Sequence, residues 1–516
     1  MTRFLVRCAS VPIAMAVLVV GAGRADARDD EEHDTESKNM KLVGFSDLQH
    51  RSTYQPTLHK QTVNGKPGYV IYTGHHPLGT NPVTGQPLPS FNPLTGQNEP
   101  NGTSIIDVTD PRHPRHLFHI PVGTSGNGGA QMVRVCNING REYMLRSFAS
   151  SAHEIWDVTD PSHPTDVRTV RNGNAVTVDA AGKVVPLSGT HKSWWECDTG
   201  IAYIVGRRVA DTAAGWRAGN HIMIYDLSNP AKPVFIRDWA LDGQQPDPNN
   251  PGKPAALPPH FTAAPAIHGP ISTGLHGRVY FAYGVGDNGV MQIADRDALL
   301  STAATDYKTA EIGRWIMQPD NGGHTSWPLG KITVPDFTTD TGNDEGNVRD
   351  VVVVVSEATA HFCAEMRHTT TTVDVTDETR PQSLATFLVP ASSGAFCDRG
   401  GRFGPHATNE EFGPPFYQKL IFVSYFNAGV RAVDVRDPYN PKEVAFFIPA
   451  PTVDTDFRCG TFKGVNNVCR QVVQTNNVAT DDRGLVYIVD RANTGMHVLR
   501  LTGKAAEIAG LRGDDD

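Results

Sequence analysis

Short runs of alternating apolar and polar residues, each closed by a polar turn, recur along the chain. The clearest run is residues 105–111 (Ile-Ile-Asp-Val-Thr-Asp-Pro), with close copies at 155–161 and 224–230. Alternation over a few residues predicts a half-buried β-strand, and the Asp/Asn-Pro cluster predicts the turn that ends it. Weaker copies are centred near positions 294, 374, 434 and 500. Self-similarity at such long spacing indicates a modular array.

Each copy predicts the same unit of about four antiparallel strands. A further apolar run follows the turn, as at 117–122 and 444–448, and another precedes each copy, as at 201–205. Seven such units predict an all-β fold, a seven-bladed β-propeller, in preference to an array of β-sandwiches. Residues 41–45 resemble the strand that follows each copy, so they are expected to complete the last blade and close the ring. Residues 506–511 are the alternative for that place.

The ends of the chain carry a different pattern. Arg3 and Arg7, an apolar run at 11–20 and the small residues at 25–27 predict a signal peptide over 1–27. We expect a disordered linker at 28–40, the propeller at 41–511 and an acidic tail at 512–516. This organisation predicts a periplasmic or secreted protein with no integral membrane span in the mature chain.

The net charge argues against nucleic acid as a partner, and the cysteine content predicts disulfides. A formal net charge of −9 gives no electrostatic case for binding nucleic acid. Six cysteines lie beyond residue 27, and an even number in an exported chain favours disulfides. Cys459 and Cys469 can close one loop, and Cys136 with Cys197 lies at similar points of adjacent blades. That leaves Cys363 and Cys397 for each other, although other connectivities stay open. Insertions interrupt the strand pattern at 77–101, 241–266 and 328–349.

Aligning the units on their first strand reveals repeated histidines. His191 stands nine residues before Gly200, and His268 stands nine before Gly277. His324 repeats the His-x-Ser-Trp sequence that begins at His191, and His406 opens the same strand of the sixth unit. The remaining slots fall on Gln131, on Gln55 or His59, and near Asn476. The first strand of a propeller blade lines the central channel, so these side chains are expected to form a ring.

Four histidines at equivalent slots, without carboxylate or thiolate, predict a transition-metal site. The predicted ligands are His191, His268, His324 and His406, and copper or iron is favoured over zinc. The alternative is that channel histidines only hydrogen-bond to neighbouring carbonyl groups. No catalytic residue is assigned, because the sequence contains no nucleophile elbow, phosphate loop, dinucleotide fingerprint or His-Glu-x-x-His motif.

Other residues are secondary candidates. His75, His76 and His153 are expected near the channel mouth. Possible orienters of the ligand imidazoles are the glutamates Glu196, Glu357, Glu410 and Glu411, although most such side chains face solvent. Packing between blades is the expected role of Trp194, Trp195 and Trp327.

The Asp-Val-Thr-Asp-Pro-x-x-Pro repeats resemble those of the LVIVD-repeat propeller proteins, which are exported bacterial proteins mostly without an assigned function. More distantly, a propeller with channel histidines is similar to the selenium-binding protein and methanethiol oxidase family, which implies a copper-dependent oxidase. Carotenoid-cleaving oxygenases hold iron on four propeller histidines, but their surrounding sequence is absent here. No catalytic motif of these families matches residue by residue.

The sequence therefore predicts an exported propeller that uses a channel metal for oxidoreductase chemistry on a small molecule. Two alternatives stay open. One is a non-catalytic scaffold that binds a protein partner or a cell-surface ligand, and the other is a metal-dependent hydrolase.

Overall fold

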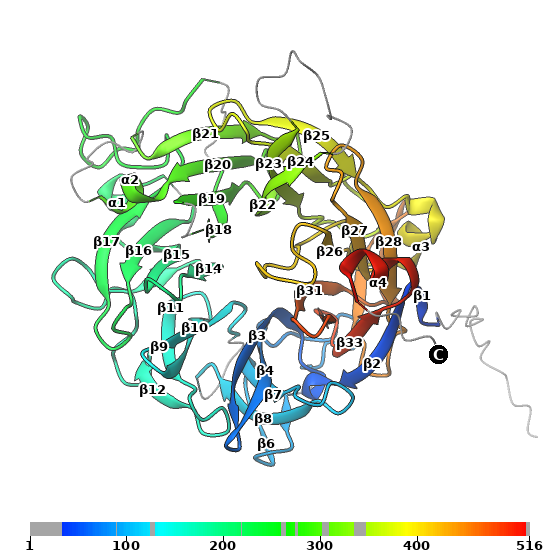
Figure 1. The fold of residues 1–516 in the computed structure, drawn as a ribbon. Helices are drawn as coiled ribbons and strands as arrows, with labels where there is room; N and C mark the ends of the chain where they lie inside the picture. The colour runs from blue at the N-terminus through cyan, green and yellow to red at the C-terminus, as the bar shows by residue number, and fades with distance from the viewer. Residues whose placement is uncertain are drawn as a thin grey trace, which may run out of the picture. The chain divides into compact units, whose positions relative to one another are not determined.

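A computed structural model describes residues 34–511, except 89, 124–128, 218, 260–264, 274–276, 302–308 and 335–346. The described part, within the unit Asp34–Asp516, is a seven-bladed β-propeller, as predicted (Figure 1). The predicted signal peptide at 1–27 and the acidic tail at 512–516 lie outside the described residues. Among the described residues, no helix is long and apolar enough to cross a membrane.

The first five blades follow one another along the chain, each with its first strand nearest the channel (Figure 1). The first blade contains β3 (Thr53–Val63), β4 (Lys66–His75), β7 (Gly102–Asp107) and β8 (Arg115–Pro121). The second contains β9 (Val133–Ile138), β10 (Arg141–Phe148), β11 (Ala152–Asp157) and β12 (Thr165–Arg168). The third contains β14 (Ser193–Trp195), β15 (Ile201–Arg208), β16 (His221–Asp226) and β17 (Val234–Trp239), with β13 (Leu187–Ser188) paired to β15. The fourth contains β18 (Ile267–Thr273), β19 (Arg278–Tyr283), β20 (Val290–Asp295) and β21 (Glu311–Ile316). The fifth contains β22 (Gly323–Thr333), β23 (Val348–Ser356), β24 (Thr370–Asp374) and β25 (Gln382–Phe387).

The N-terminal strands complete the last two blades. In the sixth blade β26 (Leu420–Ser424), β27 (Val430–Asp434) and β28 (Lys442–Ile448) are followed outward by β1 (Glu36–Lys38). In the seventh, β31 (Thr475–Thr480), β32 (Leu485–Asp490) and β33 (Met496–Leu501) are followed by β2 (Met40–Ser46). The predicted ring closure is therefore made by the N-terminal segment, and 503–509 forms the helix α4 (Gly503–Ala509) instead.

The start of the propeller differs from the prediction. Residues 28–40 were expected to be a disordered linker, yet β1 lies at Glu36–Lys38 and Met40 begins β2. The sequence Glu-Ser-Lys has no apolar alternation and so gives no strand signal. β1 is an outer strand, and it is held by its backbone pairing with β28. The fold therefore begins before residue 41.

The repeated Asp-turn has a direct structural cause. The side chain of Asp107, at the end of the third strand, accepts a hydrogen bond from the Thr109 backbone N–H at 3.0 Å. Asp157, Asp226 and Asp374 make the same contact two residues onward, which ends the strand with an Asx-turn. In every blade a register shift then falls between the strand that carries this turn position and the next strand outward. The repeats in the sequence are thus repeats of one turn and one register.

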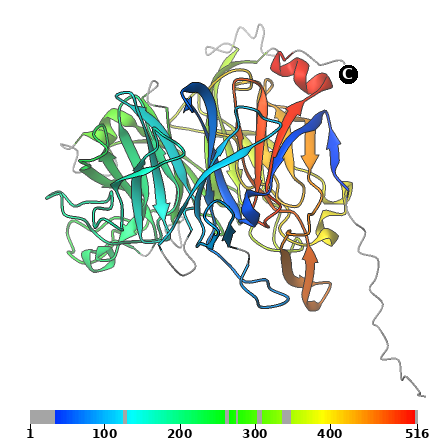
Figure 2. The same cartoon turned by 90° about the horizontal axis from the view of Figure 1, so that it is seen from below.

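Long connections gather at one end of the propeller. Strands alternate in direction within a blade, so the link from second to third strand and the link to the next blade share an end. Two added hairpins lie in such links (Figure 2): β5 (Phe91–Asn92) with β6 (Gln97–Asn98), and β29 (Phe457–Phe462) with β30 (Val465–Gln471). Two short helices, α1 (Asp211–Ala214) and α3 (Phe396–Arg399), also lie in links at this end. A third, α2 (Arg296–Leu300), lies between β20 and β21, the third and fourth strands of the fourth blade. The insertion predicted at 328–349 is shorter than expected, because residues 328–333 belong to β22 and 348–349 to β23, and 335–346 lies outside the described residues.

Removing the closing strands should weaken the ring. A chain that begins at residue 47 leaves the outer edges of β28 and β33 without a partner and loses the burial of Met40, which is 3% exposed. We expect its midpoint of thermal unfolding to fall by about 5 °C or more, with association through the open edges. Differential scanning fluorimetry and size-exclusion chromatography measure both effects, with a chain that begins at residue 34 as the control. Equal midpoints for the two proteins would contradict this role.

Candidate metal centre

Four histidines from four consecutive blades lie together at the channel. His191 precedes β14, His268 lies in β18, His324 in β22, and His406 in a segment hydrogen-bonded to β26. The ring centroids of His191 and His268 are 4.7 Å apart, those of His268 and His324 3.7 Å, and those of His324 and His406 4.1 Å. These four side chains, here called the imidazole cluster, are the set singled out by the repeat alignment.

A tyrosine that the sequence did not single out lies at the centre of this cluster. The hydroxyl of Tyr54 is 3.3 Å from Nε2 of His191, 3.3 Å from Nε2 of His268 and 3.0 Å from Nε2 of His324. Its ring also contacts His406, with centroids 5.4 Å apart. The first blade therefore contributes a phenol to the channel.

The two residues expected in the first-blade slot point elsewhere. Gln55 accepts a hydrogen bond from Asn477 at 2.7 Å, and His59 contacts Glu142 at 2.7 Å. Successive side chains of a strand point to opposite faces, and β3 has a register shift between Thr53 and Gln55. The repeat alignment identified the correct strand, β3, but assigned the slot to Gln55, one residue after Tyr54.

Backbone carbonyl groups fix the orientation of two rings. Nδ1 of His268 lies 2.8 Å from the carbonyl oxygen of His324, and Nδ1 of His406 lies 2.6 Å from that of Asn476. A carbonyl oxygen only accepts, so both Nδ1 atoms carry the proton, and both Nε2 atoms of the neutral rings present lone pairs. Nε2 of His406 has no hydrogen-bond partner among the described residues.

A glutamine fixes a third ring in the same way. Nδ1 of His191 lies 3.1 Å from Oε1 of Gln131, whose Nε2 lies 3.0 Å from Nδ1 of His76. His191 therefore also presents its Nε2 lone pair, only 2.9 Å from Nε2 of His268. Tyr54 has one hydroxyl proton to share among these acceptors. Converging lone pairs with so few protons form a site that suits a cation.

Burial keeps the cluster neutral. It lowers the pKa of His191 to about 4, and the cations of Lys192 and Arg491 add to the effect. Burial also holds the pKa values of His268, His324 and His406 well below the ordinary value. Neutral imidazole is the form that binds metal ions.

A carboxylate lies beside the cluster. Ligand atoms of His268, His324 and Glu357 all lie within 4.8 Å of one another, so this group can hold a metal ion. Oε1 of Glu357 is 3.7 Å from Nε2 of His406, and it accepts a hydrogen bond from Arg402 at 2.8 Å. Arg491 lies 3.8 Å from the same oxygen. The sequence placed Glu357 among four glutamates but gave no reason to prefer it.

The other three glutamates are buried or nearly so, but they serve different contacts. Glu196 pairs with Arg296 at the blade interface, away from the cluster. Burial raises the pKa of Glu411 to about 7. Glu410 pairs with both Lys192 and Arg134, so it links the second, third and sixth blades behind the cluster. The expectation that such glutamates mostly face solvent is wrong for these residues.

The secondary histidines lie near the end of the channel where the inner strands begin. His76 packs against Tyr54, with ring centroids 5.1 Å apart. His75 instead hydrogen-bonds to Ser104 within its blade, and burial lowers the pKa of His153 to about 3. Packing is the role of the tryptophans, as expected: Trp327 stacks on Phe412, and the others lie against neighbouring blades.

All three predicted disulfides are present. Cys136 is bonded to Cys197, Cys363 to Cys397 and Cys459 to Cys469. The first bond joins the second blade to the third, and the last closes the β29–β30 hairpin. Disulfides are typical of proteins outside the cytosol.

The fold and the cluster define a class: a disulfide-bonded, seven-bladed propeller with a buried histidine group that can hold a metal. No known family model matches the chain, and no curated protein is significantly similar to it. A solved structure of a hypothetical selenium-binding protein from Sulfolobus tokodaii is similar, with a TM-score of 0.45 and 11% identity. The match covers 78% of this chain and 84% of that protein. The resemblance to LVIVD-repeat proteins has no support from a matching family model.

Replacing Glu410 by glutamine should destabilise the protein. The side chain of Lys192 is 2% exposed and that of Arg134 12%, and both would lose their carboxylate partner. We expect a loss of about 3–5 kcal/mol in the free energy of unfolding, measured by urea denaturation. Lys192→Met in the same background should recover part of that loss, because it removes the buried cation.

The exposed pair of Lys463 and Asp398 provides the control, since Lys463→Gln should change stability by less than about 1 kcal/mol. The pairing cations hold the pKa of Glu410 below its ordinary value although burial opposes them. The effect of Glu410→Gln is therefore full at neutral pH and shrinks as pH falls through the lowered pKa. A loss below about 1 kcal/mol at neutral pH would contradict the assignment.

Proposed function

We propose that the channel binds a transition metal through the four residues of the imidazole cluster, with Glu357 beside them. The observation that supports this most strongly is the proton count. An amide and a carbonyl oxygen take the Nδ1 protons of His191 and His268, so two Nε2 lone pairs lie 2.9 Å apart with the single Tyr54 hydroxyl proton within reach of both. The Nδ1 proton of His406 goes to the Asn476 carbonyl, and its Nε2 has no hydrogen-bond partner among the described residues. Metal-ligating histidines commonly donate their other N–H to such an oxygen, which fixes the ring and raises its basicity.

The spacing of the ligand atoms bears on the metal. Two imidazole nitrogens bound to one ion at about 2.0–2.1 Å lie about 2.9 Å apart when they subtend a right angle. The Nε2 atoms of His191 and His268 are 2.9 Å apart. Imidazole donors suit copper, iron or zinc, and of these copper and iron would also supply redox chemistry. We therefore favour copper or iron.

The surroundings favour oxidoreductase chemistry on a small molecule. Copper or iron supplies redox capacity and Lewis acidity when bound. The chain itself supplies a buried environment that limits access of water, and Tyr54 offers a hydroxyl that can donate a proton to a substrate oxygen. Burial raises the pKa of Tyr54 well above the ordinary value, so the hydroxyl keeps its proton at neutral pH. We further propose that the protein acts in the periplasm or outside the cell, which the three disulfides support.

Metal content tests this function. Purified protein should carry about one equivalent of copper or iron by inductively coupled plasma mass spectrometry, after both metals have been offered and the excess removed. His268→Ala and His324→Ala should each lose at least nine-tenths of it, because each removes a converging Nε2. Glu357→Gln should weaken metal affinity by about 10–100-fold. His113→Ala is the matched control, since His113 lies on a surface turn with an 80% exposed side chain.

Folded protein that takes up neither metal would refute the proposal and favour a non-catalytic scaffold. Retention of metal by the two cluster variants would place the metal elsewhere. If metal is bound, a screen that compares oxygen consumption with ester and phosphoester hydrolysis separates an oxidoreductase from a metal-dependent hydrolase.

A further inference from the structure

One carboxylate beside the imidazole cluster is shared by two arginines. Arg402 lies in the segment before β26, and Arg491 follows β32 in the turn to β33. Nη1 of Arg402 donates to Oε1 of Glu357 at 2.8 Å, and Nη1 of Arg491 lies 3.8 Å from the same oxygen. That oxygen is itself 3.7 Å from Nε2 of His406. The two cations are therefore separated from the cluster by a single side chain.

Most of the donor groups of these two guanidiniums are unused. Each guanidinium has five N–H groups. Nη1 of Arg402 donates to Glu357 and, at 3.3 Å, to the carbonyl of Ala358. Among the described residues, Nε and Nη2 of Arg402 and all three side-chain nitrogens of Arg491 have no hydrogen-bond partner. Nη1 of Arg491 is enclosed, whereas solvent reaches Nε and Nη2 of both arginines, whose side chains are 23% and 19% exposed.

The positive charge at this place is not fully balanced. Neither Arg402 nor Arg491 forms an ion pair with a described carboxylate other than Glu357, so two cations share one negative charge. The neighbouring Arg458 has its own partner, Asp456, at 2.6 Å. Burial lowers the pKa of Arg491 to about 10, and the cation of Arg402 adds to the effect. Both causes disfavour the charged form of Arg491, and a bound anion would relieve them.

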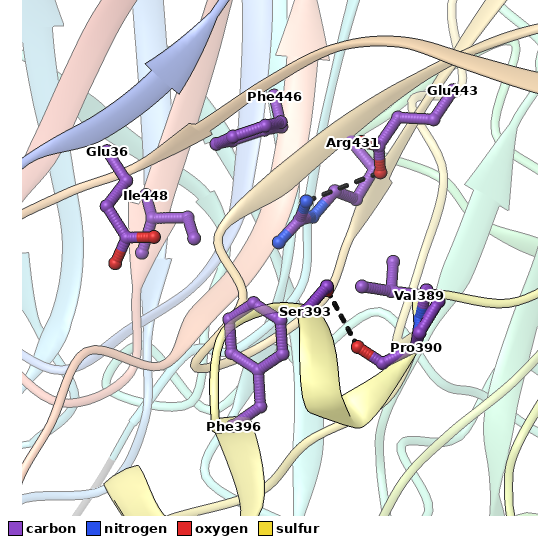
Figure 3. A pocket seen from close by; sticks show the side chains of 9 residues that line it. All are labelled: Glu36, Val389, Pro390, Ser393, Phe396, Arg431, Glu443, Phe446 and Ile448. Atoms are coloured by element: carbon purple, nitrogen blue, oxygen red, sulfur yellow. Dashed lines mark hydrogen bonds and ion pairs between the residues drawn. The ribbon is translucent and has the colours of Figure 1, made fainter.

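Arginines elsewhere in the protein show the contrasting case, a carboxylate for each guanidinium. At the outer edge of the sixth blade, Arg431 donates to Glu443 at 3.3 Å (Figure 3). In the same region Arg399 pairs with Glu36 at 2.6 Å. Both glutamates line the pocket that Figure 3 shows, so no positive charge is left over there. The surplus cation beside the imidazole cluster is thus a local feature of a chain whose formal net charge is −9.

A single aromatic ring holds both guanidiniums in place. The centroid of the Phe426 ring is 5.4 Å from Cζ of Arg402 and 5.7 Å from Cζ of Arg491. The same ring lies 5.1 Å from that of His406, and Phe426 is fully buried. Contact with an aromatic face stabilises a cation and restricts its position. The two arginines are therefore preorganised at a fixed place relative to the cluster.

We infer that Arg402 and Arg491 determine specificity by holding the carboxylate of a small organic acid beside the imidazole cluster, so that the substrate of the channel is a monoanion. A single negative charge matches the one surplus positive charge, whereas the second charge of phosphate would face Glu357. The planar guanidinium edge also matches the geometry of a carboxylate. The assignment as substrate rests on the proposed function, but binding of the anion requires only the two arginines.

Isothermal titration calorimetry with propionate, on metal-free and on metal-loaded protein, tests the inference. Propionamide, its neutral counterpart, and inorganic phosphate serve as comparison ligands in a chloride-free buffer. We expect saturable binding of propionate to both forms, at least about tenfold weaker binding of propionamide because the charge-assisted pairs are lost, and weaker binding of phosphate. Metal content is measured separately on the loaded sample, so failure of the metal site and failure of the anion site are told apart.

Two variants address the arginines by different means. Arg491→Gln removes a cation, and Arg402→Lys keeps the charge but removes the planar edge, so each should weaken propionate binding by about tenfold or more. Arg491→Gln should also leave the midpoint of thermal unfolding unchanged or raise it, because the repulsion from Arg402 is removed. A structural role would instead lower that midpoint. Arg436→Gln is the control, since Arg436 binds Asp434 at the surface.

Absence of saturable propionate binding by the wild-type protein would overturn the inference, and metal uptake by the same sample would then leave the proposed function standing. Equal affinity for propionamide or for phosphate would overturn the assignment of a carboxylate. Unchanged binding by the folded Arg491→Gln and Arg402→Lys proteins would place the anion elsewhere. Propionate binding by a protein that takes up no metal would support the anion site but overturn its assignment to a substrate.

Discussion

The closure of seven antiparallel blades around one axis is the constraint on which the channel chemistry depends. Each blade places the start of its first strand at the same end and the same distance from the axis. Residues far apart in the sequence, such as His191 and His406, are brought into one group by this arrangement alone. The group would disperse if the ring opened, since no disulfide and no ion pair links its four members directly.

The channel chemistry also requires that the imidazole rings point Nε2, and not Nδ1, toward the cluster. The fold meets it with backbone carbonyls and one amide rather than with acidic side chains. A carbonyl acceptor fixes the tautomer without adding a negative charge, so the rings stay neutral in a poorly solvated place. The one nearby carboxylate, Glu357, is itself held by Arg402. The site therefore combines strong donor atoms with little net charge of its own.

The fold class could be predicted because each repeat carries its own signal, whereas the cysteine pairing was suggested by sequence proximity, blade position and elimination with other connectivities left open. An Asp that ends the third strand and a Pro beyond it are local requirements of one turn, and they recur wherever that turn recurs. His191 and His268 were found because each lies nine residues before a glycine, His324 because it repeats the His-x-Ser-Trp sequence, and His406 because it opens the same strand of its unit. The ring of histidines as metal ligands remains a proposal.

The residues that were missed lack such a signal. Tyr54 lies one position from the expected slot, and only the register shift in β3 turns it toward the channel. Glu357 follows a second strand instead of opening a first one, so no alignment of first strands could include it. The pairing of β1 depends on backbone groups of β28, which leave no trace in the side chains of Glu36–Lys38.

The route by which the ring is closed also sets the order in which its strands can pair. Met40 pairs with Leu501, so β2, near the start of the propeller, cannot form its hydrogen bonds until residues near the other end of the chain are in place. Until this pairing forms, the outer edge of β33 has no strand partner. Lys38 lies on β1 and Lys41 on β2, and their charges disfavour pairing of these strands with a second copy of the chain. The charged residues at the start of the propeller thus disfavour association between copies of the chain before the ring closes.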